Sequence, residues 1–170
     1  MKQVNPLVII YTLALLGSVF HAQALTTDKD QPIQIEADRL DIDDKRHLST
    51  YQGNVEMRQG SLTIRAERIV FHFNDKNDLL HLEISGTPAE FNQLNDEQQV
   101  VSGSANTILY YENESLLKLQ GNARFQSNED IIESELISVN TDTNALKAGD
   151  SESKQRVRML IQPQSSPPAE

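Results

Sequence analysis

The chain of 170 residues contains no cysteine, and aromatic residues make up only 5% of it. The lack of cysteine excludes disulfide bonds and thiolate metal sites. The low aromatic content argues against a surface on which sugars or single-stranded nucleic acid would stack. Stability must therefore come from side-chain packing and strand pairing.

Positive charge is also scarce. The chain has 15 lysine and arginine residues against 25 acidic ones, a formal net charge of −10 at pH 7. Proteins that bind nucleic acid normally present a basic face to the phosphates. The composition therefore predicts that nucleic acid is not a partner.

Motifs for catalysis and metal binding are missing as well. There is no phosphate-cradling glycine loop, no G-x-S-x-G and no H-E-x-x-H. His47, His72 and His81 lack the spacing of metal ligands within one motif. His72 lies between Phe71 and Phe73, so we expect it on the solvated face of a strand. The sequence predicts a protein that is not an enzyme and that uses no cofactor or metal.

The N-terminus has the pattern of a secretory signal peptide. Lys2 precedes an apolar stretch at residues 7–20, and Ala22 and Ala24 are the small residues that signal peptidase reads. We expect residues 1–24 to be removed, although an uncleaved membrane anchor is an alternative. Residues 25–162 would then form one domain. Residues 163–170, rich in proline and serine, would form a disordered tail.

Four segments of the remaining chain resemble one another, beginning near residues 33, 62, 101 and 131. Repeats of this length usually form stacked units that share one long core. Each segment has a small residue early and a glycine late. The equivalent positions are Ala37, Ala66, Ala105 and Ser134, followed by Gly53, Gly86, Gly121 and Gly149.

Apolar residues alternate within each segment with the period of a β-strand, but the alternation slips. Ile35 and Ala37 share one parity, whereas Leu40 has the other. A bulge or corner can turn the following side chains back inward. Polar turns rich in Asn and Asp follow, at residues 41–46, 73–78, 111–115 and 140–144. Each glycine would then form a second corner on the returning strand.

These patterns predict an all-β, antiparallel protein made of about four strand-corner-strand repeats, which fold into a slender roll of two sheets. The interior could be a closed hydrophobic core or an apolar groove open along one side, because periodicity does not distinguish them. The residues expected to face inward are Ile33, Ile35, Ala37, Leu40, Ile42, Val55, Met57, Leu62, Ile64, Ala66, Ile69, Phe71, Phe73, Ile84, Phe91, Ala105, Ile108, Tyr110, Leu119, Phe125 and Val139.

Three stretches carry a resemblance to a known family. DQPIQIEADRLDIDD, YQGNVEMRQGSLTIRAERI and LQGNARF resemble the periplasmic lipopolysaccharide-transport protein A (LptA/OstA-like) family, and the match extends over about residues 28–161. The resemblance implies a twisted antiparallel β-jellyroll, V-shaped in section, whose interior holds the acyl chains of lipopolysaccharide. Family positions that face the lipid correspond to Ile33, Ile35, Phe91 and Tyr110. The inward parity adds Leu40, Ile64, Phe71, Ile108 and Phe125 to the lipid-binding candidates.

The resemblance also implies a place and partners. Such a protein would lie in the periplasm and bridge an inner-membrane ABC export complex, through a jellyroll subunit, to an outer-membrane translocon. Copies would stack as a head-to-tail homo-oligomer. Two alternatives stay open: a membrane-anchored accessory jellyroll of the same pathway, and a self-assembling structural β-solenoid without cargo.

The two ends of the predicted roll are candidate partner surfaces, because each would present an unpaired strand. DQPIQIEAD begins the first unit, and RVRMLIQ alternates apolar residues as a final strand. One end could pair with the other end of a second copy by strand addition. The partner-edge candidates are Ile33, Ile35, Val157, Met159 and Ile161.

Cleavage of the leader is directly measurable. If Ala24 ends the signal peptide, mass spectrometry of protein from the periplasm should show Leu25 as the first residue. A protein that retains Met1 and sediments with membranes would instead support the anchored alternative.

Overall fold

The computed structural model describes residues 28–95, 97–127, 129–150 and 155–161. The expected leader and tail lie outside the described residues. The described chain has ten strands, two 3₁₀ turns and no α-helix. No helix among the described residues is long and apolar enough to cross a membrane.

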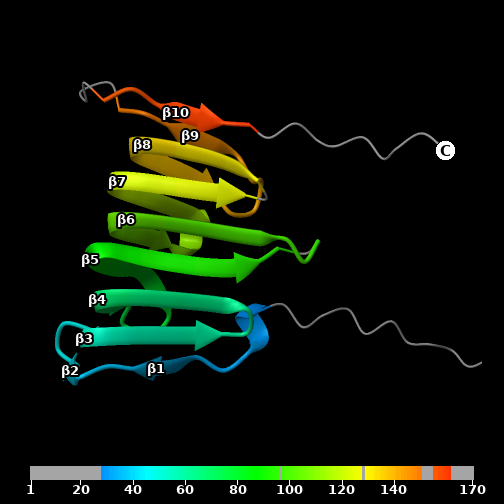
Figure 1. Ribbon diagram of the computed structural model, residues 1–170. Coiled ribbons are helices and arrows are strands. Elements are labelled where there is room, and N and C mark those ends of the chain that lie inside the picture. The colour runs from blue at the N-terminus through cyan, green and yellow to red at the C-terminus, as the bar shows by residue number, and fades with distance from the viewer. Residues whose placement is uncertain (1–27, 96, 128, 151–154, 162–170) are drawn as a thin grey trace, which may run out of the picture.

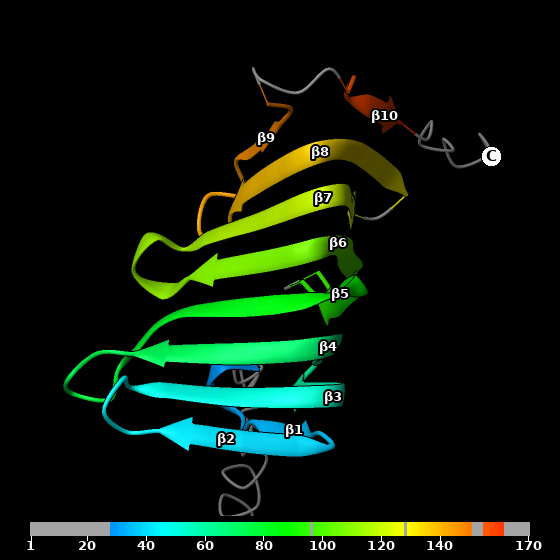
Figure 2. The same cartoon turned by 90° about the vertical axis from the view of Figure 1, so that its left-hand side faces the viewer.

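All ten strands belong to one antiparallel sheet. The order is β1-β3-β4-β5-β6-β7-β8-β10, with β2 also paired to β3 and β9 also paired to β8. Figure 1 and Figure 2 show the strands stacked as rungs, from β1 and β2 at one end to β9 and β10 at the other. The strands are β1 (Gln34–Glu36), β2 (Arg39–Asp43), β3 (Leu48–Gln59), β4 (Leu62–Phe73), β5 (Leu79–Leu94), β6 (Val100–Tyr111), β7 (Leu116–Ser127), β8 (Asp130–Asn140), β9 (Leu146–Ala148) and β10 (Arg158–Leu160); the 3₁₀ turns are η1 (Asp28–Asp30) and η2 (Glu112–Glu114).

A line of irregularities crosses the middle of the long strands. Each pairing from β3–β4 to β7–β8 shifts register once near mid-strand, for example between Gln52 and Val55 of β3. The line divides the sheet into two arms. Arm 1 contains β1, β10 and the adjoining halves of the long strands, and arm 2 contains β2, β9 and the other halves. The slips in apolar parity therefore mark a real bend.

The bend differs from the prediction in one respect. Two separate corners in each unit were expected, joining two sheets. Instead, the corner of each outgoing strand pairs beside the corner of the returning strand, so that one continuous sheet folds once along one line. The strands that cross this line are long, 11 to 16 residues, because each of them belongs to both arms.

The recurring Gly-Asn dipeptide forms this bend in β3 and β7. Gly53 and Gly121 have φ angles of 80° and 77°, and Asn54 and Asn122 follow with 45° and 51°. Two successive residues in the left-handed region turn the chain sharply. Glycine adopts this region without steric cost, and asparagine tolerates it better than most residues.

Space at the bend is a second reason for glycine. A Cβ on Gly53 would overlap the Asp38 carboxylate, and a Cβ on Gly121 would lie 2.7 Å from Asn106 Nδ2. Asn54 donates a hydrogen bond of 2.8 Å from Nδ2 to Asp38 Oδ2. The outer side of the bend is thus a tightly packed polar seam.

The predicted equivalence of four glycines is only partly right. Gly86 does not adopt the left-handed conformation, and the bend in β5 instead includes a cis peptide bond between Thr87 and Pro88. Thr87 donates a hydrogen bond of 2.5 Å to Glu67 Oε1 on the neighbouring strand. Gly149 has a φ of 100° and lies just after β9. The third and fourth units therefore reach the same line by different local chemistry.

Apolar residues form continuous rows across the inner side of the sheet, because paired residues of neighbouring strands share a face. The interior of each row is buried, and its two ends are not. The arm 1 row is Ile35, Met57, Ile64, Phe91, Gly103, Phe125, Ile132 and Met159. The arm 2 row is Leu40, Tyr51, Ile69, Ile84, Ile108, Leu119, Ile137 and Ala148.

Most residues expected to face inward are buried in this core or packed against it. Four are exposed because they lie at the first edge of the sheet, with no strand beyond them: Ile33, Ala37, Leu40 and Ile42. Alternation had been followed too sparingly elsewhere, so four core residues were missed: Leu82, Ala89, Ala123 and Ile137.

His72 lies on the outer face, as expected, but it is only half-exposed. Its ring stacks on His81 at 3.9 Å, and His81 stacks on Tyr111 at 5.6 Å. Burial lowers the pKa of His72, and the adjacent His81 lowers it further. The expectation of a fully solvated histidine is therefore wrong, since cross-strand rings cover it.

Substitution at the bend tests its role. Gly121→Ala should lower the free energy of unfolding by about 1–3 kcal/mol, because the backbone is left-handed and the new methyl group would crowd Asn106. Urea denaturation measures the change. In the double variant Gly121→Ala/Asn106→Ala, relief of crowding should restore part of the loss. Parental stability of Gly121→Ala would contradict this account of the bend.

Candidate functional site

The candidate site is the space between the two arms. Over most of its length this space is filled by interdigitating side chains of the inner rows, which are at most 8% exposed. The interior is thus a closed core at its centre. Only the ends of the fold leave apolar surface uncovered.

At the end formed by β1 and β2, the arms enclose an open cavity of about 290 Å³. We call this cavity the mouth. It is almost entirely apolar, which is typical of sites that bind small apolar ligands. Arm 1 contributes Ile33 and Ile35, and arm 2 contributes Ser49, Tyr51, Phe71 and Phe73.

Aromatic rings form the arm 2 wall of the mouth. Tyr51 meets Phe71 edge to face at a centroid distance of 5.7 Å, and Phe71 stacks on Phe73 at 6.1 Å. Such contacts hold large rings in defined positions. The wall is therefore a fixed apolar surface that begins at the edge of the sheet.

Exposed aliphatic residues extend this surface outward. Ile33 and Leu40 are each 48% exposed, and Ile42 is 64% exposed. Leu40 pairs with Tyr51, and Ile42 pairs with Ser49, so both lie on the inner rows. The first edge of the sheet is apolar on its inner side.

Two aromatic residues lie deeper, in the closed part of arm 1. Phe91 and Phe125 are 7% and 8% exposed, with centroids 6.5 Å apart. Gly103 pairs with both, and a Cβ there would overlap the Phe91 ring. The missing side chain at Gly103 makes room for the two rings.

Tyr110 lies near the tip of arm 2, beside the turn that follows β6. It is half-buried, and burial raises the pKa of its phenol, with Glu112 raising it further. The phenol therefore stays neutral at physiological pH. A neutral amphipathic ring at this position has an apolar side toward the core.

The structure places the predicted lipid-binding residues in three settings. Ile33, Ile35 and Phe71 line the mouth, and Leu40 is exposed next to it. Tyr110 is half-buried. The buried remainder is Ile64, Phe91, Ile108 and Phe125. Sequence reasoning did not assign Ser49 and Tyr51 to the wall, although their shared parity before the Gly53 bend was a usable signal.

A polar clamp fixes the segment that enters the mouth. Asp28 accepts hydrogen bonds from the Ser61 N–H at 2.8 Å, from Ser61 Oγ at 2.5 Å and from Gln93 Nε2 at 3.0 Å. Although burial raises the pKa of Asp28, these hydrogen bonds outweigh it and lower the pKa. Gln59 Nε2 donates to the Lys29 carbonyl at 3.1 Å. The clamp ties η1 to the turn between β3 and β4, just ahead of Ile33.

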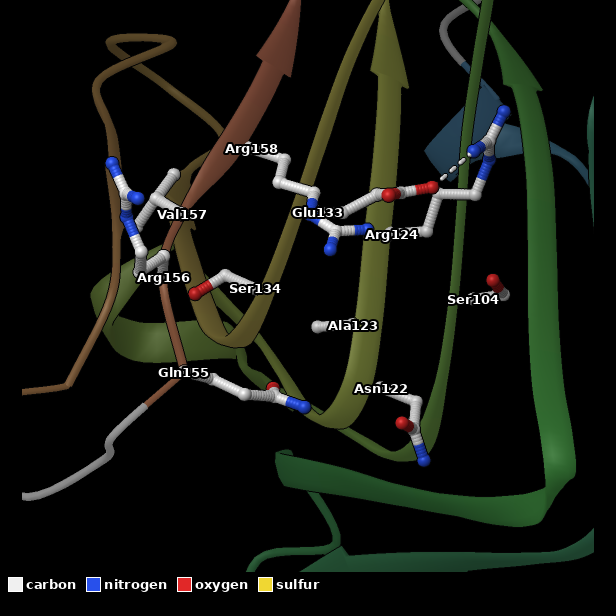
Figure 3. Close-up of a pocket in the computed structure, with 10 residues that line it drawn as sticks. All are labelled: Ser104, Asn122, Ala123, Arg124, Glu133, Ser134, Gln155, Arg156, Val157 and Arg158. Atoms are coloured by element: carbon white, nitrogen blue, oxygen red, sulfur yellow. Dashed lines mark hydrogen bonds and ion pairs between the residues drawn. The ribbon is translucent and has the colours of Figure 1, made fainter.

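A second cavity, of about 710 Å³, lies at the opposite end and is polar (Figure 3). Arg124 forms an ion pair of 2.6 Å with Glu133, and Arg158 lies beside this pair. The lining residues are Ser104, Asn122, Ala123, Arg124, Glu133, Ser134, Gln155, Arg156, Val157 and Arg158. One end of the fold thus presents an apolar mouth, and the other a basic, polar surface.

Within the described ranges, no group of three or more His, Cys, Asp or Glu side chains could hold a metal ion. The chemistry that the mouth can perform is the binding of an apolar chain, which would continue the apolar rows outward.

The chain is similar to three curated relatives. It is 30% identical to the lipopolysaccharide export system protein LptH of Pseudomonas aeruginosa, over 96% of this chain and 97% of that protein. It is 30% identical to LptA of Haemophilus influenzae, over 94% and 92%, respectively. It is 28% identical to LptA of Escherichia coli K12, over 90% and 83%.

A solved structure is also similar. The crystal structure of Pseudomonas aeruginosa LptH matches with a TM-score of 0.71 and 26% identity, and the match covers 80% of this chain and 99% of the other. That protein is described as the LptA homologous periplasmic component of the lipopolysaccharide transport device. The likeness confirms the expected fold, an antiparallel β-jellyroll.

A family model provides the remaining finding. Residues 34–145 match the model of the LptA/(LptD N-terminal domain) LPS transport proteins. The matched range runs from the first residue of β1 to the turn before β9. With its bent antiparallel sheet and apolar inner rows, the chain belongs to the LptA/LptD N-terminal domain family of lipopolysaccharide transport proteins.

Proposed function

We propose that the protein is a periplasmic carrier that binds lipopolysaccharide and shelters its acyl chains between the two arms. Members of this family are transport proteins, so the chain is not an enzyme. The observation that supports the proposal most is the open apolar mouth, which leads directly into the inner rows. The lipid-binding residues proposed are the nine predicted ones, joined by Tyr51 and Phe73.

The size of the mouth limits what it holds in the free protein. A cavity of about 290 Å³ lies at the lower end of the range for small-ligand sites, roughly 300–1,000 Å³. It therefore accepts part of a chain. Deeper entry requires the arms to separate at residues such as Phe91 and Ile108, which are packed together in the core. Binding is thus coupled to a small opening of the V.

The energetics favour a passive role. Burial of an acyl chain of about a dozen methylenes stabilises it by on the order of 10 kcal/mol, at ~0.8 kcal/mol per methylene. Extraction from a membrane therefore needs an energy source, and the sequence has no nucleotide-binding motif. The work would be done by an inner-membrane ABC export complex. The net charge of −10 keeps the anionic sugar and phosphates outside the arms.

The edges of the sheet supply the proposed contacts with partners. β1 and β10 end the strand order, and each has one side free of strand partners within the described chain. Ile35 and Met159 lie in these strands, and Ile33, Val157 and Ile161 flank them. The first edge would receive lipid from a jellyroll subunit of the export complex, and the last would lead toward the outer-membrane translocon. Copies of the chain would stack head to tail between them.

The alternatives account for less of the structure. A cargo-free β-solenoid would share the rows and the edges, but it has no need of an open apolar mouth. A membrane-anchored accessory jellyroll differs in its N-terminus, which lies outside the described residues.

Photo-crosslinking tests the cargo site. A photo-reactive residue at Ile35 or Phe71 should capture lipopolysaccharide in cells, because both line the mouth. His72 is the matched control, since it is adjacent to Phe71 but on the outer face, and it should capture little. A probe at Phe91 would report opening of the arms. Equal capture at Phe71 and His72 would show that the lipid does not bind between the arms.

Proline substitution tests the stacking. Along an edge strand alternate N–H groups point outward, so Met159→Pro or Leu160→Pro should remove one outward donor from β10. That variant should lose the concentration-dependent oligomers seen by light scattering, while circular dichroism stays β-rich. If both variants assemble like the parent, copies do not stack through this strand.

A further inference from the structure

The inference concerns how two copies would meet, and it rests on the head-to-tail stacking proposed above. Every strand pairing in the sheet is antiparallel. Along the strand order β1-β3-β4-β5-β6-β7-β8-β10, direction therefore alternates, and β10 runs opposite to β1. The β1 strand of a second copy, placed beyond β10, would continue this alternation. The same holds for β2 beyond β9.

The register of such a junction follows from the rows. If each row continues straight, Ile35 of the next copy lies opposite Met159, and Leu40 of the next copy lies opposite Ala148. All four residues belong to inner rows, and Met159 is 56% exposed in the single copy. The apolar interior would then run unbroken from one copy into the next.

The outer row of arm 1 carries charges that pair across strands. It begins with Glu36 and ends with Glu133 and Arg158. Within this row, Arg124 and Glu133 lie on neighbouring strands and form an ion pair of 2.6 Å. The row therefore already has the geometry for cross-strand ion pairs. A straight continuation puts Glu36 of the next copy opposite Arg158.

Arm 2 repeats this arrangement. Its outer row begins with Asp41 and ends with Lys147. Lys147 and Arg158 are exposed and form no ion pair within the part of the chain that the structure describes. Asp41 already binds Arg39 at 2.7 Å, so its attraction to a second copy is the weaker of the two.

The edges as a whole have opposite charge. β1 and β2 together hold Glu36, Asp41 and Asp43 against Arg39, a net charge of −2. β9 and β10 hold Lys147 and Arg158 and no acid, a net charge of +2. In a chain of net charge −10, the basic last edge is an exception. Contacts between two first edges or between two last edges would place like charges together.

We propose that Glu36 with Arg158, and Asp41 with Lys147, set the register and polarity of the junction between successive copies. The ion pairs lie on the outer face and leave the apolar rows continuous. A different jellyroll could replace either neighbour if its facing edge had the complementary charge.

Charge exchange between the two ends tests this register. Variant A carries Arg158→Glu and Lys147→Glu, so that both ends are acidic. Variant B carries Glu36→Lys and Asp41→Lys, so that both ends are basic. Alone, each should associate on the order of tenfold or more weakly than the parent, because like charges then face each other. Mixed in equal amounts, A and B should assemble again into an alternating polymer, measured by sedimentation velocity.

Two controls make the outcome specific. Lys76→Glu reverses one charge in the turn between β4 and β5, away from both edges, and should assemble like the parent. Circular dichroism of A and B should match the parent, since all four positions are exposed. If the parent assembles but the mixture of A and B does not, or if A and B assemble alone like the parent, this register is wrong. A parent that stays monomeric at every concentration overturns the register together with homotypic stacking, while lipid capture in the mouth would still be decided by the crosslinking.

Discussion

The bend that crosses every long strand is the constraint on which the rest of the structure depends. A flat sheet of this composition would bury its apolar face only against another element, and the described chain has no helix or second sheet to provide one. Because left-handed residues at Gly53–Asn54 and Gly121–Asn122 fold the sheet on itself, its two halves bury each other. One sheet thus supplies both sides of its own core.

Folding along a line, rather than closing into a barrel, has a consequence for function. Each inner row is buried at its centre, where neighbouring strands and the opposite arm cover it, and exposed at its ends. The mouth at Ile35 and Phe71 is therefore the unfinished end of the core. A lipid chain there, or the rows of another copy, would complete the same apolar packing. Binding of cargo and stacking of copies thus draw on one physical property.

Much of this was predictable from the sequence because it is periodic. The slip in parity between Ala37 and Leu40 marks the bend, and alternation identified the core from Val55 to Val139. Two features were not predictable. The cis peptide at Pro88 replaces a left-handed glycine in β5, and no local pattern encodes that choice. The exposure of Ile42, at 64%, depends on its place in an edge strand, which alternation does not reveal.

The central claim is that acyl chains bind on the inner side of the bent sheet. Methyl NMR of the protein with lipopolysaccharide measures this directly, through nuclear Overhauser effects between acyl-chain protons and assigned methyl groups. The account predicts effects to Ile35 and Ile42, on the inner rows, and none to Leu109, on the outer face of arm 2. Effects to Leu109 with none to the two isoleucines would contradict it.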